Sequence, residues 1–275
     1  MTGFDEDWYL ERYPDVADSV KNGLIPSALE HFLRHGKEEG RLPTRPEPIV
    51  HVHIPKTAGS SVWVALQDAG RNIFAADEHF EFNPAVHSKF DVFTGHFGFS
   101  RAKSVGGELI TVLRDPVDRF ISSYYHLAHI FRIDAEITER TRIAATYPLG
   151  EFVTIFDCPS LIADLYNSMV WQIATGATVE ERLGFRANNH VNDNELLTIA
   201  KRNLQTFSVV GFQNALDVFG ERMQTRFGVR LHLGRHNENS DRPPLADISA
   251  SIKHKVEKWV ELDRELYEFA RVEFG

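Results

Sequence analysis

Short runs of β-branched and other apolar residues alternate along most of the chain with longer stretches whose apolar positions recur at helical spacing. The first run spans residues 49–54, and we expect further strands at 91–94, 109–113 and 208–211. Helices are predicted between and after these strands, including a long amphipathic helix from about 248 to 272. Strands interspersed with helices predict an α/β fold in which a central, mostly parallel sheet is flanked by helices.

The N-terminal part of the chain carries a different pattern, with short amphipathic helices. Asp5 is placed to cap one helix, and a second helix is expected over 26–36. The apolar face predicted for this second helix consists of Leu29, Phe32 and Leu33. A proline-rich stretch at 43–48 then predicts a stiff linker. We therefore expect a small helical module at 1–42, a linker, and one main domain at 49–275.

Composition and charge narrow the functional classes. The formal net charge of −9 argues against nucleic acid or an anionic membrane as a partner, because both usually need a basic surface. Cys158 is the only cysteine, so neither an intrachain disulfide nor a zinc site built of cysteines is expected. The acidic N-terminus lacks the pattern of a signal peptide, and no stretch approaches the roughly 20 apolar residues of a transmembrane helix. These features favour a cytoplasmic protein with no transmembrane segment.

The strongest chemical signal follows the first predicted strand. A loop of small residues leads directly into a helix, so backbone N–H groups and the positive end of the helix dipole face the same point. The cradle is predicted from Lys56, Thr57, Ala58, Gly59, Ser60 and Ser61. The lysine charge and the hydroxyl donors suit a phosphate or phosphosulfate. Lys56 precedes Gly59, unlike the G-x-x-x-x-G-K-[ST] order of nucleoside triphosphatases, which disfavours an ATPase. The structural alternative is an ordinary turn with an exposed lysine.

The second chemical signal follows the predicted strand at 109–113. Arg114 stands at the strand end, where its guanidinium can bind a phosphate with two hydrogen bonds. Ser122 lies about two turns into the next helix and can face the same phosphate if the loop folds back. A structural ion pair is the alternative for Arg114. Caps and surface ion pairs are preferred for Asp115, Asp118 and Arg119.

Together these two segments resemble the 5′-phosphosulfate loop and the 3′-phosphate motif of the sulfotransferases that use PAPS (3′-phosphoadenosine-5′-phosphosulfate). The branch most similar to them is the carbohydrate family that includes heparan-sulfate 2-O-sulfotransferases, with motifs H-I-P-K-T-[AG]-G-[ST]-[ST] and L-R-D-P-x-x-R-x-x-S-x-Y-Y. The resemblance runs from Ile49 to the C-terminus, but only the two motifs are specific. Weaker similarities lie at 165–172, at 210–213 (where Gln213 replaces the usual Glu) and at 236–240. The resemblance implies a P-loop-NTPase-like sulfotransferase fold of the bacterial type.

The resemblance also assigns a catalytic base. His96, after the predicted strand at 91–94, matches a histidine that removes the acceptor proton in this family. A neutral imidazole near pH 7 suits that role. Glu78 and His79 are rival candidates, because some sulfotransferases use a carboxylate. Thr94 stands where several relatives have a second histidine.

The mechanism implied by the resemblance needs no metal. The N–H groups of 57–61 would hold the 5′-phosphate and Lys56 would neutralise the departing PAP, while Arg114 and Ser122 would hold the 3′-phosphate. His51 and His53 alternate along a predicted strand without an acidic partner motif, so they do not predict a metal site.

The acceptor is less well defined by the sequence. Family resemblance points to a carbohydrate hydroxyl, and the arginines of the intervening region are candidates to meet an anionic sugar: Arg132, Arg140, Arg142, Arg182 and Arg186. A solvated helix face is the more ordinary interpretation of such charges. Residues 1–42 resemble a module found beside bacterial glycosyltransferases. Two interpretations follow: docking to glycan-assembly enzymes, or a helical decoration that packs on the main domain. The alternatives are a non-catalytic nucleotide-binding scaffold, a sulfotransferase for a non-carbohydrate small molecule, and a magnesium-dependent small-molecule kinase.

Overall fold

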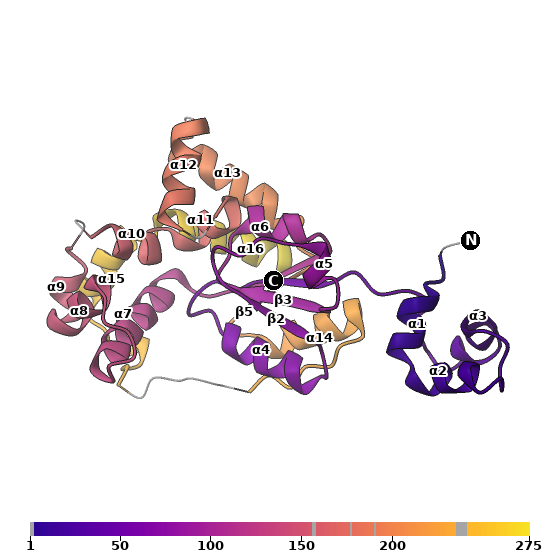
Figure 1. The fold of residues 1–275 in the computed structure, drawn as a ribbon. Coiled ribbons are helices and arrows are strands. Elements are labelled where there is room, and N and C mark those ends of the chain that lie inside the picture. Colours follow the sequence, from indigo (N-terminus) through magenta and orange to yellow (C-terminus); the bar gives the residue numbers. More distant parts are fainter. Residues whose placement is uncertain (1–2, 156–157, 177, 190, 235–240) are drawn as a thin grey trace. The chain divides into compact units, whose positions relative to one another are not determined.

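The chain forms two compact units, which divide between Glu47 and Pro48. The structure, a computed structural model, describes residues 3–155, 158–176, 178–189, 191–234 and 241–275 (Figure 1). Each unit is described by itself.

The N-terminal unit is a cluster of short helices with a small aromatic core. Its helices are α1 (Glu6–Arg12), α2 (Pro14–Lys21) and α3 (Ala28–His31), and α3 continues into the π-helical turn η1 (Phe32–Gly36). Asp5 caps α1 as predicted, accepting a hydrogen bond from the N–H of Trp8 at 3.0 Å. The predicted apolar face is wrong in part: Phe32 is buried, but Leu29 and Leu33 are 42% and 55% exposed. The core is instead formed by Trp8, Tyr9, Val16, Ala28 and Phe32.

The larger unit is built on a five-stranded sheet, and every neighbouring pair of strands is parallel. The strands are β1 (Ile49–Val52), β2 (Ile73–Ala76), β3 (Val92–Gly95), β4 (Glu108–Leu113) and β5 (Val209–Phe212). Their order across the sheet is β2-β3-β1-β4-β5, so β1 lies in the centre between β3 and β4. The expected α/β fold with a parallel sheet is confirmed. The edge strand β2 was not predicted from the sequence.

Helices cover both faces of this sheet (Figure 1). One face packs on α4 (Gly59–Asp68) and α14 (Leu216–Phe227), with Ile49, Ile110 and Val209 pointing toward them. The opposite face, which carries Val50 and Val52, forms the larger core. The helices there are α6 (Phe99–Val105), α11 (Ser168–Ala174), α13 (Asp193–Leu204) and α16 (Glu261–Phe274). The alternation of side chains along β1 thus assigns Ile49 and His51 to the α4 face, and His53, just beyond the strand, continues this spacing.

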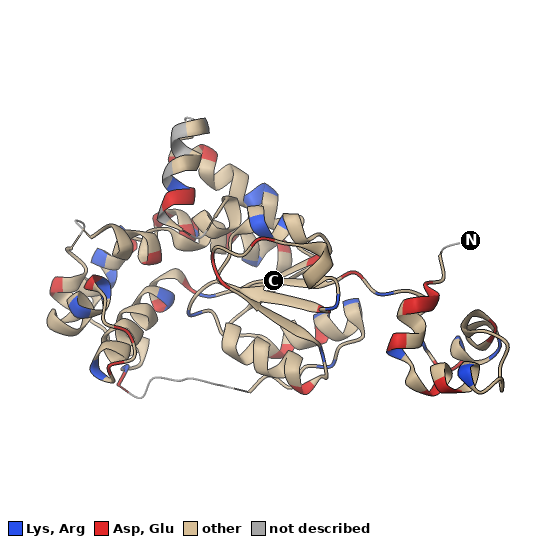
Figure 2. Ribbon diagram, in the orientation of Figure 1, with Lys and Arg blue, Asp and Glu red and all other residues tan. Residues whose placement is uncertain are grey.

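A further group of helices has its own core around Phe120 and Trp259. It contains α7 (Pro116–Arg132), α8 (Glu139–Thr146), α9 (Leu149–Phe152), α10 (Pro159–Leu165) and α15 (Ala250–Glu257). The remaining elements are α5 (Pro84–His87), α12 (Val179–Asn189) and the 3₁₀ turn η2 (Leu245–Asp247). Figure 2 shows that charged residues are spread over the helices and loops, while the strands are almost free of them.

The single long helix expected over 248–272 is wrong, because the chain breaks between α15 and α16. At the break the buried Trp259 donates its indole N–H to the carbonyl oxygen of Val153 at 2.8 Å. The side-chain oxygen of Asn167 then accepts hydrogen bonds from the N–H groups of Leu262 and Asp263, in the first turn of α16. These tertiary contacts compensate for the interrupted helix.

Among the described helices, none combines the length and the apolar character needed to cross a membrane.

Candidate active site

The three predicted site segments follow three adjacent strands. His96 comes directly after β3, Lys56 lies four residues beyond β1, and Arg114 comes directly after β4. Since the strands are parallel, their carboxyl ends meet at one edge of the sheet, where open α/β sheets bind ligands. The loops also touch: Arg114 Nη1 donates to the carbonyl oxygen of Lys56 at 2.9 Å. The structure therefore brings together the predicted anion cradle, the predicted phosphate-binding arginine and the predicted base.

The loop after β1 is held in an unusual backbone conformation. Lys56 and Ala58 have φ angles of 68° and 81°, in the left-handed region that residues other than glycine rarely adopt. The hydroxyl of Thr57 donates to the carbonyl oxygen of Ile54 at 2.8 Å and so closes the loop from within. The hydroxyl proton of Thr57 is therefore used inside the loop. Strained non-glycine residues of this kind concentrate at functional sites.

Helix α4 starts at Gly59 at the end of this loop, and Ala58 is its N-cap. Glycine is required at position 59, because a Cβ atom there would overlap with the ring of His53. Ser60 lies in the first turn of α4 half-buried, and Ser61 beside it is 3% exposed. Four N–H groups at a helix start have no partner within the helix, so this terminus offers donors and positive potential at the carboxyl edge of the sheet.

Positive charge concentrates around Lys56. Burial lowers the pKa of its ammonium group to about 8, and the neighbouring cations Arg114 and Arg242 add to that decrease. The lysine is still mainly protonated at pH 7. The positive charges of Lys56, Arg114 and Arg242 repel one another in the free protein, and a bound anion would offset this repulsion.

Arg242 is a residue that the sequence analysis missed. Its guanidinium forms an ion pair with Asp118, which also pairs with Arg114 Nε at 2.6 Å. One carboxylate thus orients two arginines, and the group as a whole stays positive. Arg242 lies two residues beyond the weakly similar stretch 236–240, which is outside the described residues; in the sequence, only that proximity marked the position.

The start of α7 shows both caps and deep burial. Asp115 caps the helix through the N–H of Asp118 at 2.9 Å, as predicted. Ser122 is 8% exposed and lies one turn beyond Asp118, on the same face of α7. The surface ion pair predicted for Arg119 is wrong: its side chain is fully buried, 3.9 Å from the equally buried Asp263, and it donates to the carbonyl oxygen of Leu165. Arg119 therefore links α7 to α10 and α16.

His96 is exposed to solvent at the carboxyl end of β3. Enough protein surrounds its ring that desolvation lowers its pKa, and the charges of Lys56 and Arg140 act in the same direction, while Asp164 opposes them. The imidazole is therefore neutral at pH 7 and accessible. The rival candidates Glu78 and His79 lie in the loop after β2, where their side chains are 52% and 68% exposed and form a loose 3.7 Å pair.

Two amide side chains in the weakly similar segment at 165–172 have structural partners. Asn167 caps α16, as described above. Gln172 Nε2 donates to the carbonyl oxygens of His53 and Phe97, both at 3.0 Å, and so joins the segments that follow β1 and β3. Sequence similarity marked this helix, but the bridge could not be inferred from it.

Most of the arginines suggested for an anionic acceptor have partners within the protein. Arg140 pairs with Asp164 at 2.6 Å and with Glu136 at 2.7 Å, and Arg132 pairs with Asp241 at 3.3 Å. Arg182 donates to the backbone carbonyl of Ala163. Arg142 is exposed, and the side chain of Arg186 lies outside the described part of the chain. These contacts favour a structural role for Arg132, Arg140 and Arg182.

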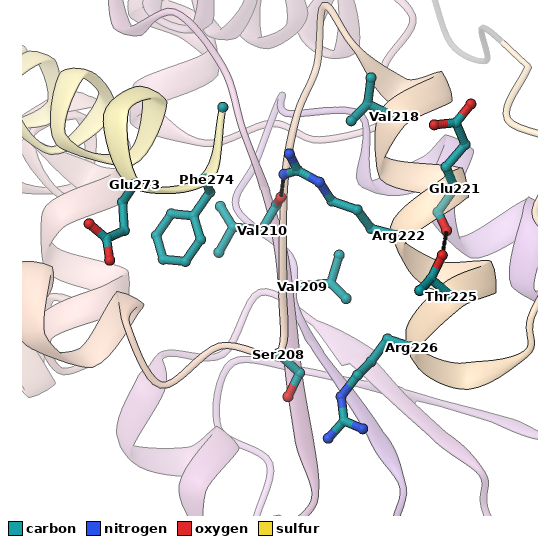
Figure 3. Close-up of a pocket in the computed structure, with 11 residues that line it drawn as sticks. Ser208, Val209, Val210, Val218, Glu221, Arg222, Thr225, Arg226, Glu273 and Phe274 are labelled. Carbon is teal, nitrogen blue, oxygen red and sulfur yellow. Dashed lines mark hydrogen bonds between the residues drawn. The ribbon is translucent and has the colours of Figure 1, made fainter.

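A groove of about 660 Å³ lies elsewhere, along the outer edge of β5 (Figure 3). It is lined by residues of β5, α14 and the end of α16, and contains none of the predicted site residues. Arg222 Nη1 crosses it to donate to the carbonyl oxygen of Val210 at 2.9 Å.

Comparison with known proteins adds two findings. Residues 44–270 match the family model described as "Sulfotransferase family". The chain is also similar to heparan-sulfate 6-O-sulfotransferase 3-B of Danio rerio, with 28% identity over 181 residues. That alignment covers 59% of this chain and 41% of the relative, so the chain spans less than half of the relative's length.

Proposed function

Because this chain belongs to the sulfotransferase family, we propose that it transfers a sulfuryl group from PAPS to a hydroxyl group of a carbohydrate and releases PAP. The observation that carries the proposal is the meeting of the Lys56 loop and Arg114 at adjacent strand ends, joined by a hydrogen bond, with His96 after the next strand.

In this proposal the donor is held by its two phosphate-bearing ends. The backbone N–H groups of residues 57–61 and the start of α4 bind the 5′-phosphate. Arg114 and Ser122 bind the 3′-phosphate, which distinguishes PAPS from ordinary adenine nucleotides. Arg242 adds charge on the same side, since it shares Asp118 with Arg114. Asp118 keeps both guanidinium groups oriented while the site is empty.

The transfer step is an in-line displacement at sulfur. A bond forms between the acceptor oxygen and sulfur as the bond between sulfur and the phosphate oxygen of PAP breaks. His96 takes the acceptor's proton, and Lys56 stabilises the charge that develops on the departing phosphate oxygen. The proton on His96 later passes to solvent, so the products are a sulfate ester, PAP and a proton. Lysine and backbone dipoles supply the positive field in this scheme, and it requires no metal.

A carbohydrate acceptor is supported by the similarity to heparan-sulfate 6-O-sulfotransferase 3-B, whose name gives heparan sulfate as its substrate. Residues 1–42 are proposed to dock to glycan-assembly enzymes, and the N-terminal unit has a core of its own that would permit such a separate role. A uronate-binding arginine is not part of the proposal, because Arg132, Arg140 and Arg182 are already partnered.

The test is turnover of PAPS with a panel of glycans and small hydroxyl compounds, together with calorimetry of PAP binding. We expect PAP to bind and sulfate to be transferred, in the presence of EDTA as well as without it. Absence of PAP binding would reject the donor assignment, strict dependence on magnesium would favour a kinase, and PAP binding without any transfer would favour a scaffold.

Replacement of Arg114 by Ala should weaken PAP binding by about 10- to 100-fold, because a charge-assisted, two-point contact to the 3′-phosphate is lost. Binding of the analogue without the 3′-phosphate should change little. Calorimetry with both ligands measures the difference. Since Arg114 also holds the Lys56 carbonyl, equal losses for the two ligands would show that it supports the loop rather than contacting the phosphate.

A further inference from the structure

Three histidine rings form a continuous row from the interior of the sheet to the candidate base. His51 and His53 lie two residues apart on β1 and its extension, so their side chains share one face. Their rings stack with centroids 5.5 Å apart and planes 10° from parallel. The ring of His53 then meets the ring of His96 edge to face, with centroids 4.5 Å apart.

The inner end of this row is fixed. His51 is fully buried, and its Nδ1 atom lies 2.9 Å from the hydroxyl of Thr94 on the neighbouring strand. Burial lowers the pKa of His51 to about 3, so the ring is neutral. Its Nε2 atom is buried and has no hydrogen-bond partner among the described residues, and the ring stacks on His53.

The middle ring belongs to a half-buried residue and has three close neighbours among the described residues. It packs against His51 on one side and His96 on another, and it fills the space where a Cβ atom of Gly59 would stand. Its backbone is held by two hydrogen bonds at 3.0 Å, from its N–H to the carbonyl of Gly95 and from Gln172 to its carbonyl. His53 therefore touches the start of the anion-binding helix and the candidate base at once.

We propose that His53 is a positioning residue for His96, wedged between Gly59 and the imidazole of His96 so that the ring of the base is held toward the donor loop. The inference rests on the proposed role of His96 in sulfuryl transfer. Among the residues that the structure describes, the ring of His53 has no acidic partner and no hydrogen bond, so its role is to pack rather than to exchange protons.

The groups around His96 support a neutral, oriented ring. His53 and Lys56 come from β1 and its loop, His126 from α7, Arg140 from α8 and Asp164 from α10. Burial and the neighbouring histidines lower the pKa of His53 well below its usual range, so His53 adds bulk but no charge. Among the charged groups in the described part of the chain, Asp164 is the one that favours the protonated form of His96, and it is already paired with Arg140.

The experiment compares His53→Ala, His53→Phe and the exposed control His254→Ala on the full chain. We expect His53→Ala to lower kcat roughly 10- to 100-fold without changing PAP affinity, because the base is no longer held in place. The NMR titration of the His96 ring should move to higher pH, since water enters the space left by the ring. His53→Phe restores a ring of similar shape. It should recover much of kcat, and the His96 ring should again titrate at the lower pH of the wild type. His254→Ala should match the wild type.

A double-mutant cycle with His96→Ala gives the sharpest result. If His53 acts through His96, His53→Ala should have little further effect on kcat once His96 is gone. An unchanged kcat and His96 titration in His53→Ala would overturn the proposal, as would the same loss in both backgrounds or a parallel loss of PAP binding. A wild-type chain without PAPS turnover would reject the proposed function instead, and the NMR comparison would still test the contact between the rings.

Discussion

Lys56→Ala should lower kcat for sulfuryl transfer by at least about 10²-fold, because the charge that stabilises the departing phosphate oxygen is removed from a partly desolvated site. Steady-state kinetics with saturating PAPS measures the effect. PAP binding should weaken less than turnover, since the backbone N–H groups of the loop remain.

Two companion variants make this result specific. Lys103→Ala removes an exposed lysine from α6 and should leave turnover unchanged. Lys56→Gly removes the same side chain, but glycine adopts a φ angle of 68° without strain. This variant should be as inactive as Lys56→Ala, and its unfolding temperature should be no lower than that of Lys56→Ala. Near-normal turnover in both Lys56 variants would show that the lysine does not take part in catalysis.

His96→Ala should reduce kcat by about 10²- to 10⁴-fold, the range that a general base contributes, with PAP affinity retained. The comparison is with the double variant of Glu78→Ala and His79→Ala, which should stay active. If that double variant were inactive and His96→Ala active, the base would belong to the loop after β2.

The free protein should show a bell-shaped dependence of kcat/KM on pH. His96 must be neutral to accept a proton, and its pKa is lowered, so the acid limb should lie below pH 6.5. Lys56 must be protonated, so the alkaline limb should lie near pH 8. Bound donor brings negative charge to Lys56 and raises its pKa, so the alkaline limb of kcat should appear at higher pH than that of kcat/KM. Coincident alkaline limbs would contradict this account.

The sequence predicts the elements that carry the site because their signals are local. A strand end, a small-residue loop and a helix start lie within a dozen residues at Lys56 and again at Arg114, and parallel strands bring such loops to one edge. Strand β2 was missed because Ile73–Ala76 is half-buried and contains two alanines, so it shows no alternation. Its pairing with β3 comes from the tertiary structure.

The features that the sequence did not reveal depend on partners far along the chain. Arginine is usually a surface residue, but Arg119 is buried because its charge faces the buried carboxylate of Asp263 on α16. Nothing in the residues around Trp259 forbids a helix, and the break is defined by tertiary contacts, among them those to the carbonyl of Val153 and to Asn167. Arg242 likewise becomes visible through Asp118. Pairwise contacts of this kind leave no periodic signal.

The hydrogen bond from Arg222 to the carbonyl oxygen of Val210 also bears on whether the sheet edge at β5 can pair with another molecule. An edge strand with unpaired carbonyl groups can form hydrogen bonds with a strand of another chain, and such pairing is a common route to aggregation. Here the guanidinium occupies the Val210 carbonyl and places a charge over the border of β5. This contact removes one free acceptor from the edge and so disfavours pairing of β5 with a strand of a neighbouring molecule.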